Sequence, residues 1–129
     1  METIRLEEIG LKPTEAAWAA GILDGEGCFT MRDSPCVCVE STSRETTEEL
    51  FRMLGGNCSA VSRRTNADRA VFRWRIYGKN AIKLCGVLKA YMREKSHQAE
   101  LLIHSLRFPP RSAMRNSIKS RLKKFKKAE

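Results

Sequence analysis

Two acidic residues alternate with glycines in the sequence Asp24-Gly25-Glu26-Gly27, directly after an apolar, alanine-rich stretch. One glycine is enough to end a helix, so Glu26 is expected on an open backbone turn. A carboxylate there can hold Mg²⁺, which neutralises charge on a phosphate during phosphodiester hydrolysis and activates water. One carboxylate is a poor magnesium site. Two copies of Glu26 meeting at a dimer axis would make a competent one.

The stretch before these acids predicts a helix from Thr14, which is suited to be its N-cap, to about Asp24. Trp18 and Ile22 are expected in the core of the domain. Another set of residues recurs at the i, i+3, i+4, i+7 spacing of one helix face and is short enough to let a second helix approach. This predicted dimer-interface set is Ala17, Ala20, Gly21 and Asp24.

After Gly27 the apolar residues alternate, which indicates strands. Hairpins are expected over 29–40 and 58–77, the second with Trp74 in the core. Helices are expected over 45–54, 81–92 and 94–106. The order α-β-β-α-β-β-α-α predicts an α+β fold, in which a four-stranded antiparallel sheet carries its helices on one face.

A sheet covered on one side exposes the alternate side chains of its strands on the other. Arginines on such a face could pair with guanine in the major groove of DNA, and an ordinary solvated sheet face is the alternative. The residues expected on this open face are Thr30, Arg32, Cys36, Cys38, Glu40, Ser62, Arg64, Arg73 and Arg75.

The net charge of +9 is concentrated at the C-terminus, where residues 111–129 hold eight Lys or Arg against one acid. We therefore divide the chain into a domain over 1–110 and a basic tail or helix over 111–129. Such a segment suits a polyanion, and a solvated tail is the alternative. The lysines expected to contact DNA are Lys119, Lys123 and Lys124.

The five cysteines are odd in number and form no CxxC pair, which favours reduced intracellular thiols over a zinc site or disulfides. The sequence has no signal-like or membrane-length apolar segment, so we expect a soluble protein that does not contact membranes. His97 and His104 are expected to be core or surface histidines, because no cysteine stands at a zinc-like spacing from them.

The segment Ala19 to Gly27 (AAGILDGEG) resembles the nine-residue signature of the LAGLIDADG homing endonucleases, and the likeness extends into Cys28 and Phe29. The expected αββαββα order also agrees with the half-repeat of that family. Without the preceding AAGILD, Glu26 would be interpreted as a surface acid. Because the motif occurs once, the resemblance implies a homodimer whose two sheets form a saddle over double-stranded DNA.

The resemblance implies site-specific cleavage of a long, nearly palindromic DNA site, as in enzymes associated with introns. Each active site would cut one strand, with Mg²⁺ as the cofactor, Mn²⁺ able to substitute, and no small-molecule cofactor. The resemblance makes Glu26 and Gly25 the metal site and Asp24 a brace between helix ends. It places Lys95 near the scissile phosphate, and Ser41 or Thr42 near the attacking water, where some relatives have Gln.

Two other functions stay open from the sequence. A protein of the same fold could bind DNA without cutting it, as a regulator, or could assist RNA splicing. A small basic protein could instead bind nucleic acid through its tail alone, without sequence preference.

Overall fold

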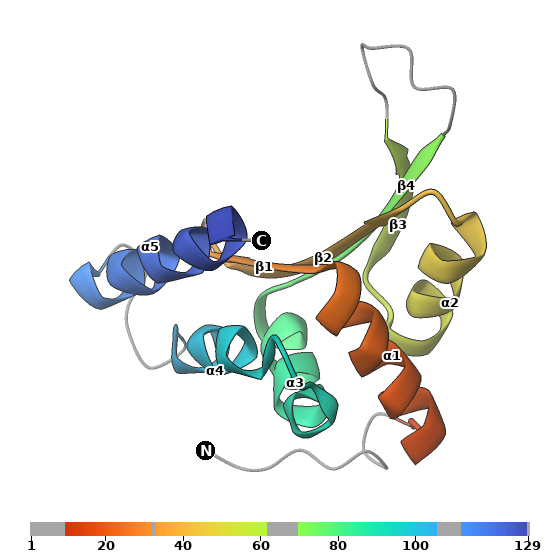
Figure 1. Cartoon of the computed structure of the whole chain (residues 1–129), viewed down its shortest axis with the longest axis horizontal. Coiled ribbons are helices and arrows are strands. Elements are labelled where there is room, and N and C mark those ends of the chain that lie inside the picture. The colour runs from red at the N-terminus through yellow and green to blue at the C-terminus, as the bar shows by residue number, and fades with distance from the viewer. Residues whose placement is uncertain (1–9, 32, 62–69, 106–111, 129) are drawn as a thin grey trace.

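A four-stranded antiparallel sheet carries the helices on one face, as the sequence pattern predicts (Figure 1). This computed structural model describes residues 10–31, 33–61, 70–105 and 112–128. The strands lie side by side in the order β1-β2-β4-β3. Their bounds are Gly27–Met31 for β1, Pro35–Ser41 for β2, Asn57–Val61 for β3 and Val71–Tyr77 for β4.

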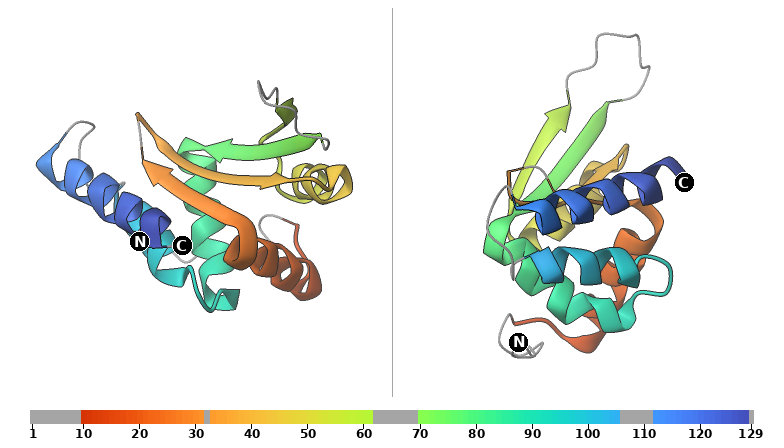
Figure 2. Two further views of the ribbon diagram at one scale, coloured as in Figure 1. Left: turned by 45° about the horizontal axis from the view of Figure 1, so that its top comes forward. Right: turned by 90° about the vertical axis from the view of Figure 1, so that its left-hand side faces the viewer.

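The helices α1, α3 and α4 lie beneath the sheet in the view of Figure 1, with α2 under its β3–β4 end. The C-terminal helix α5 packs against β1 and α4 (Figure 2). Among the described residues, no helix is both long and apolar enough to cross a membrane. The helices are α1 (Pro13–Glu26), α2 (Arg44–Leu54), α3 (Gly78–Leu88), the 3₁₀ turn η2 (Lys89–Tyr91), α4 (Ser96–Ser105) and α5 (Ala113–Ala128).

The alternation predicted for the strands is observed in the burial of β1 and β2, whereas β3 does not alternate and β4 buries Val71 in addition to Trp74 and Ile76. In the first hairpin Phe29 and Val37 face each other and both are buried. In the second, Trp74 is fully buried and its Nε1–H donates to the backbone oxygen of Gly55 at 2.7 Å. Because the indole nitrogen is satisfied, the core accommodates this large side chain without an unpaired donor.

The position of Trp18 was wrongly predicted. Its side chain is 38% exposed, and the face of α1 that meets the core consists instead of small residues and one leucine: Ala16, Ala19, Ala20 and Leu23. Alanines allow the helix to lie close to the sheet and to α3, so the large aromatic ring is left on the outer side.

The ends of α1 also differ from expectation. Lys12 precedes the helix, with its N–H donating to Glu15 Oε1 at 3.1 Å, and Thr14 is inside it. The helix continues through Gly25 and Glu26 and passes directly into β1 at Gly27, without an intervening turn.

Gly27 is not required by its backbone conformation, because its φ of −70° is accessible to any residue. It is required because there is no space for a side chain. A Cβ at this position would lie 2.5 Å from the backbone oxygen of Leu23. The close approach of β1 to the last turn of α1 therefore excludes a side chain.

Other helix ends follow their local sequence. Ser43 caps α2 by accepting the N–H of Thr46 at 3.2 Å, and Gly55 and Gly56 end it with φ values of 76° and 87°. Gly78, with a φ of 64°, starts α3 three residues before the expected Ala81.

The basic C-terminal segment is helical and belongs to the core. Ile118 and Leu122 of α5 are 4% and 2% exposed and are part of the same buried cluster as the sheet and the other helices. This apolar side faces inward, while Arg121, Lys123 and Lys124 are exposed on the other side.

We expect Gly27→Ala to lower the free energy of unfolding by about 1–3 kcal/mol, because the added methyl overlaps backbone that cannot move away. Gly86→Ala is the matched control: nothing lies within 4 Å of a Cβ there, and the glycine is inside α3. That change should be neutral or stabilising by up to about 1 kcal/mol. Urea unfolding followed by circular dichroism measures both, and equal effects would contradict the close-approach argument.

Candidate nucleic-acid interface

The open face of the sheet is hollowed into a cavity of about 580 Å³. Six residues expected on this face line it: Thr30, Cys36, Cys38, Glu40, Arg73 and Arg75. Arg32, Ser62 and Arg64 lie outside the described residues. The cavity also includes Cys28 and Tyr77, which the strand alternation could have identified, and Asp33 and Ser34 from the hairpin turn.

The two arginines of β4 are held differently. Glu40 faces Arg73 across β2 and β4 and accepts from its Nε at 2.8 Å and from a terminal nitrogen at 2.5 Å, which raises the pKa of Arg73. The guanidinium of Arg75 lies 5.6 Å from the ring centroid of Tyr77, within the range of a cation–π contact. Among the described residues, Arg75 forms no ion pair with an acid, and it presents its donors to the cavity.

The cavity is not cationic by itself. Its described charged residues are three acids, Glu26, Asp33 and Glu40, against Arg73 and Arg75. Burial, with the neighbouring Cys36, raises the pKa of the Cys38 thiol to about 11, so this thiol stays protonated and neutral near neutral pH.

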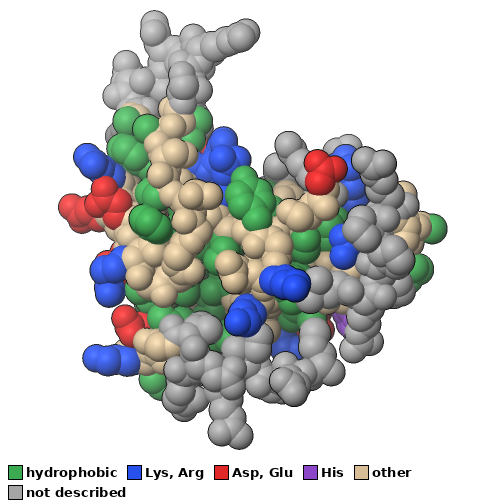
Figure 3. All heavy atoms as spheres, turned by 180° about the vertical axis from the view of Figure 1, so that it is seen from behind, with side chains coloured by type: hydrophobic (Ala, Val, Ile, Leu, Met, Phe, Trp, Pro, Cys, Tyr) green, Lys and Arg blue, Asp and Glu red, His purple; other side chains and the backbone are tan. Residues whose placement is uncertain are grey.

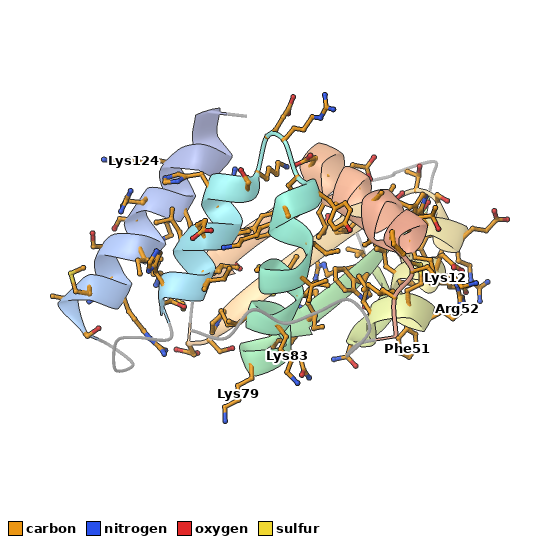
Figure 4. The ribbon with its side chains drawn as sticks, turned by 90° about the horizontal axis from the view of Figure 1, so that it is seen from below. Lys12, Phe51, Arg52, Lys79, Lys83 and Lys124 are labelled. Atoms are coloured by element: carbon orange, nitrogen blue, oxygen red, sulfur yellow. The ribbon has the colours of Figure 1, made fainter. Side chains whose placement is uncertain are left out.

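The cations gather beside the cavity, on α5. Lys119 and Lys123, one helical turn apart, border a hollow at the β1 edge together with Thr30 and Asp33, which also line the main cavity. Lys124 projects outward from α5 in Figure 4, where Lys79 and Lys83 project from α3 on another side. Further Lys and Arg side chains spread over the back of the molecule (Figure 3).

Glu26 is exposed at the rim of the cavity, as the last residue of α1, next to the exposed Gly25. Among the described residues, no group of three His, Cys, Asp or Glu could hold a metal ion. The chemistry of this end of α1 fits half of a magnesium site, since it supplies one carboxylate and an open backbone.

Asp24 ties the end of α1 to the segment before α4. Its carboxylate accepts the backbone N–H groups of Arg93 at 2.7 Å, Glu94 at 3.2 Å and Lys95 at 3.0 Å. These donors come about seventy residues later in the chain. A single side chain thus fixes two segments that are distant in sequence.

Lys95 makes a second contact between the same two segments, this time from its own side chain to the first residue of β1. Its side chain is buried, and Nζ donates to the backbone oxygen of Gly27 at 2.7 Å. The ammonium therefore lies beneath the residue that follows Glu26. It places a positive charge close to the end of α1 that bears the candidate ligand.

Ser41 is not brought to this site. It follows Glu40 on β2, so alternation turns it away from the open face, and it is absent from the cavity lining. Its Oγ accepts the backbone N–H of Ser43 at 3.0 Å. Thr42 lies just beyond the strand and is exposed.

The residues expected at a dimer interface divide into two groups. Ala17 and Gly21 are exposed on α1, together with Trp18 and Gly25. Ala20 is fully buried in the protomer, and Asp24 is engaged with the 93–95 segment. The outer face of α1 is thus almost bare of large side chains, apart from the indole of Trp18.

Comparison with known proteins gives a likeness in structure only. No protein-family model matches the chain, and no curated protein matches it. The homing endonuclease I-CvuI, in complex with the I-CreI target with 2 mM Mg and the DNA not cleaved, superposes with a TM-score of 0.59 at 18% identity. The match covers 73% of this chain and 66% of I-CvuI, just under two thirds of that protein.

I-CvuI with its own target and 2 mM Ca gives the same values. The archaeal intron-encoded homing endonuclease I-Vdi141I, complexed with DNA, has a TM-score of 0.55 at 14% identity, over 88% of this chain and 97% of that one. The chain has the fold of the LAGLIDADG homing endonucleases. The cavity lined by Arg73 and Arg75 lies on the open face of the sheet in this fold.

We expect Asp24→Ala to lower the free energy of unfolding by about 1–3 kcal/mol, because three backbone donors lose a charged acceptor. Glu94→Ala is the control, since it removes an exposed carboxylate from the same segment. Thermal or urea unfolding measures both. A loss for Asp24→Ala no larger than that for Glu94→Ala would show that the tie contributes little.

Proposed function

We propose that the protein is a site-specific DNA endonuclease of the homing type, acting as a homodimer with Mg²⁺ on double-stranded DNA. The observation that carries this proposal is the position of Glu26, which stands at the end of α1 on the rim of an open, arginine-bearing sheet face. The structural neighbours are homing endonucleases in complex with DNA, which supports DNA as the substrate.

The sheet and α5 have different tasks in this proposal. Arg75, braced by Tyr77, suits direct contact with a guanine edge, while Arg73 shares its charge with Glu40 and contributes less attraction. Lys119 and Lys123 at the β1 edge, and the outward-pointing Lys124, would meet the phosphate backbone of DNA laid across the open face. The Lys and Arg of α5 supply most of the affinity, and the sheet supplies the base selection.

At the reacting phosphate, Glu26 of each subunit and the backbone of Gly25 would hold the metal. When bound, Mg²⁺ supplies charge neutralisation at the phosphate and an activated water. Lys95, fixed beneath Gly27, favours an anionic phosphate at the end of α1 and stabilises the charge that develops there. Ser41 has no part in this scheme, because it faces away from the cavity.

Dimerisation completes the site. The exposed Ala17, Gly21 and Gly25 allow two copies of α1 to approach closely about a two-fold axis, so both copies of Glu26 come near that axis. A two-fold protein then selects a nearly two-fold target, as the resemblance implies.

We expect Glu26→Gln to abolish cleavage while leaving specific binding largely unchanged, because the amide cannot replace the charged metal ligand. A binding-site selection first supplies the target, and supercoiled plasmid carrying it is then incubated with Mg²⁺, Ca²⁺ or chelator. Glu94→Gln is the control, because Glu94 is exposed and lies outside the cavity. Cleavage by Glu26→Gln at the wild-type rate would end the proposed metal role.

The same assay separates the other candidates. A wild-type protein that binds its selected site but leaves the plasmid intact with Mg²⁺ would be a non-cleaving DNA-binding protein of this fold. A protein that selects no sequence would bind through its basic helix alone.

We expect Gly21→Leu to convert the dimer to a monomer with little change in protomer stability. Nothing lies within 4 Å of a Cβ at this position, so the protomer accepts the side chain, whereas a second α1 helix could not approach it closely. Sedimentation velocity measures the oligomeric state, and Gly86→Ala in α3 is the control. A Gly21→Leu protein that remains dimeric would place the interface elsewhere.

A further inference from the structure

Three of the five thiols share the open face of the sheet. Cys28 on β1 is the direct partner of Cys38 on β2, and Cys36 lies two residues before Cys38 on the same strand. All three are half-buried and part of the lining of the main cavity. Cys58 faces Trp74 in the β3–β4 pairing, and Cys85 is buried in α3.

Only one pair of these thiols has the geometry of a disulfide. Directly facing residues of antiparallel strands have Cα atoms about 4.5–5.5 Å apart, within the range of about 4.4–6.8 Å found in disulfides. Cys28 and Cys38 are such a pair.

The two pairings that involve Cys36 do not have the distances that a disulfide requires. Cys28 and Cys36 are diagonal neighbours, about 7–8 Å apart. Cys36 and Cys38 are about 6.6 Å apart along one strand with parallel side chains, whereas a disulfide needs Cβ atoms about 3.5–4.5 Å apart.

We propose that Cys28 and Cys38 form an oxidisable dithiol on the open face of the sheet, which a hydroperoxide converts to a cross-strand disulfide. One oxygen of the hydroperoxide passes to the sulfur of Cys28, which becomes a sulfenic acid while an alcohol is released, since the Cys38 thiol is held protonated. The facing thiol attacks that sulfur, the S–S bond forms, and its proton leaves with the hydroxyl as water. Two thiols are oxidised and one O–O bond is reduced.

Because the two sulfurs line the cavity, bound DNA would cover them, and this part of the inference rests on the proposed function. The sulfurs line the surface on which that function places the DNA. A hydroperoxide reaches them when the face is free, and bound DNA covers them. The dithiol is therefore open to oxidation in the free protein and shielded in the complex.

The test treats the full chain with tert-butyl hydroperoxide, blocks remaining thiols with N-ethylmaleimide and maps the peptides by mass spectrometry. We expect one disulfide, Cys28–Cys38, reversed by dithiothreitol. Cys28→Ser and Cys38→Ser should each abolish it, whereas Cys36→Ser and Cys58→Ser should leave it in place. No cross-link in the wild-type chain, or one that survives Cys28→Ser, would overturn the proposal without any reliance on the variants' function.

A second arm repeats the oxidation with the selected DNA at about ten times its Kd, where about one tenth of the protein is free. We expect the rate of disulfide formation to fall about tenfold, and unselected DNA at the same concentration to protect less. If the disulfide forms at the same rate with and without DNA, the placement of DNA on this face fails while the dithiol stands. If no disulfide forms in either arm, the dithiol fails and the proposed function is untouched.

Discussion

The contact on which the site depends is the tie between the end of α1 and the segment before α4. Asp24 accepts three consecutive backbone donors, and Lys95 returns a hydrogen bond to the backbone of Gly27. Charge-assisted bonds of this kind are stronger than neutral ones, and here they join opposite ends of the domain's sequence. The direction in which α1 delivers Glu26 to the sheet is therefore fixed from both sides.

The close packing of α1 follows from the same junction. Because β1 begins immediately after Glu26, the first strand residue lies against the last helical turn, and only glycine fits there. Alanines on the inner side of α1 bring the helix near the core. A helix seated this deeply leaves the small residues Ala17, Gly21 and Gly25 on its outer face beside the indole of Trp18, and the proposed dimer needs this face.

Sequence alone predicted the strands and their faces well, since alternation is a local signal that every residue of a hairpin repeats. Phe29, Val37 and Trp74 are buried, and Arg73 and Arg75 reach the open face, as expected. Prediction from the sequence failed where contacts with residues distant in the chain determine the position of a side chain. A large aromatic residue by itself favours burial. Trp18 is nevertheless on the outer side of α1, because the neighbouring alanines occupy the side that packs against the core.

Part of the site was predictable because it depends on local sequence signals. Glu26 on the rim of the open face combines a motif with the strand register, both readable in the chain. The contacts of Asp24 and Lys95 were not derivable from spacing, because their partners lie about seventy residues away. Nor does a run of lysines reveal that Ile118 and Leu122 anchor α5 in the core, since two apolar residues one helical turn apart also suit a solvated tail.

The anchoring of α5 changes how DNA affinity would arise. The described part of the cavity holds more acids than arginines, so the open face alone would attract a polyanion weakly. The lysines of α5 supply the missing field, and they do so from a fixed position at the β1 edge because Leu122 holds the helix there. A flexible tail would add attraction without direction. In the proposed function, a packed cationic helix would add attraction at one edge of the sheet and so orient the phosphate backbone before any base contact is made. A face poor in net charge would then discriminate between bases without holding every sequence tightly.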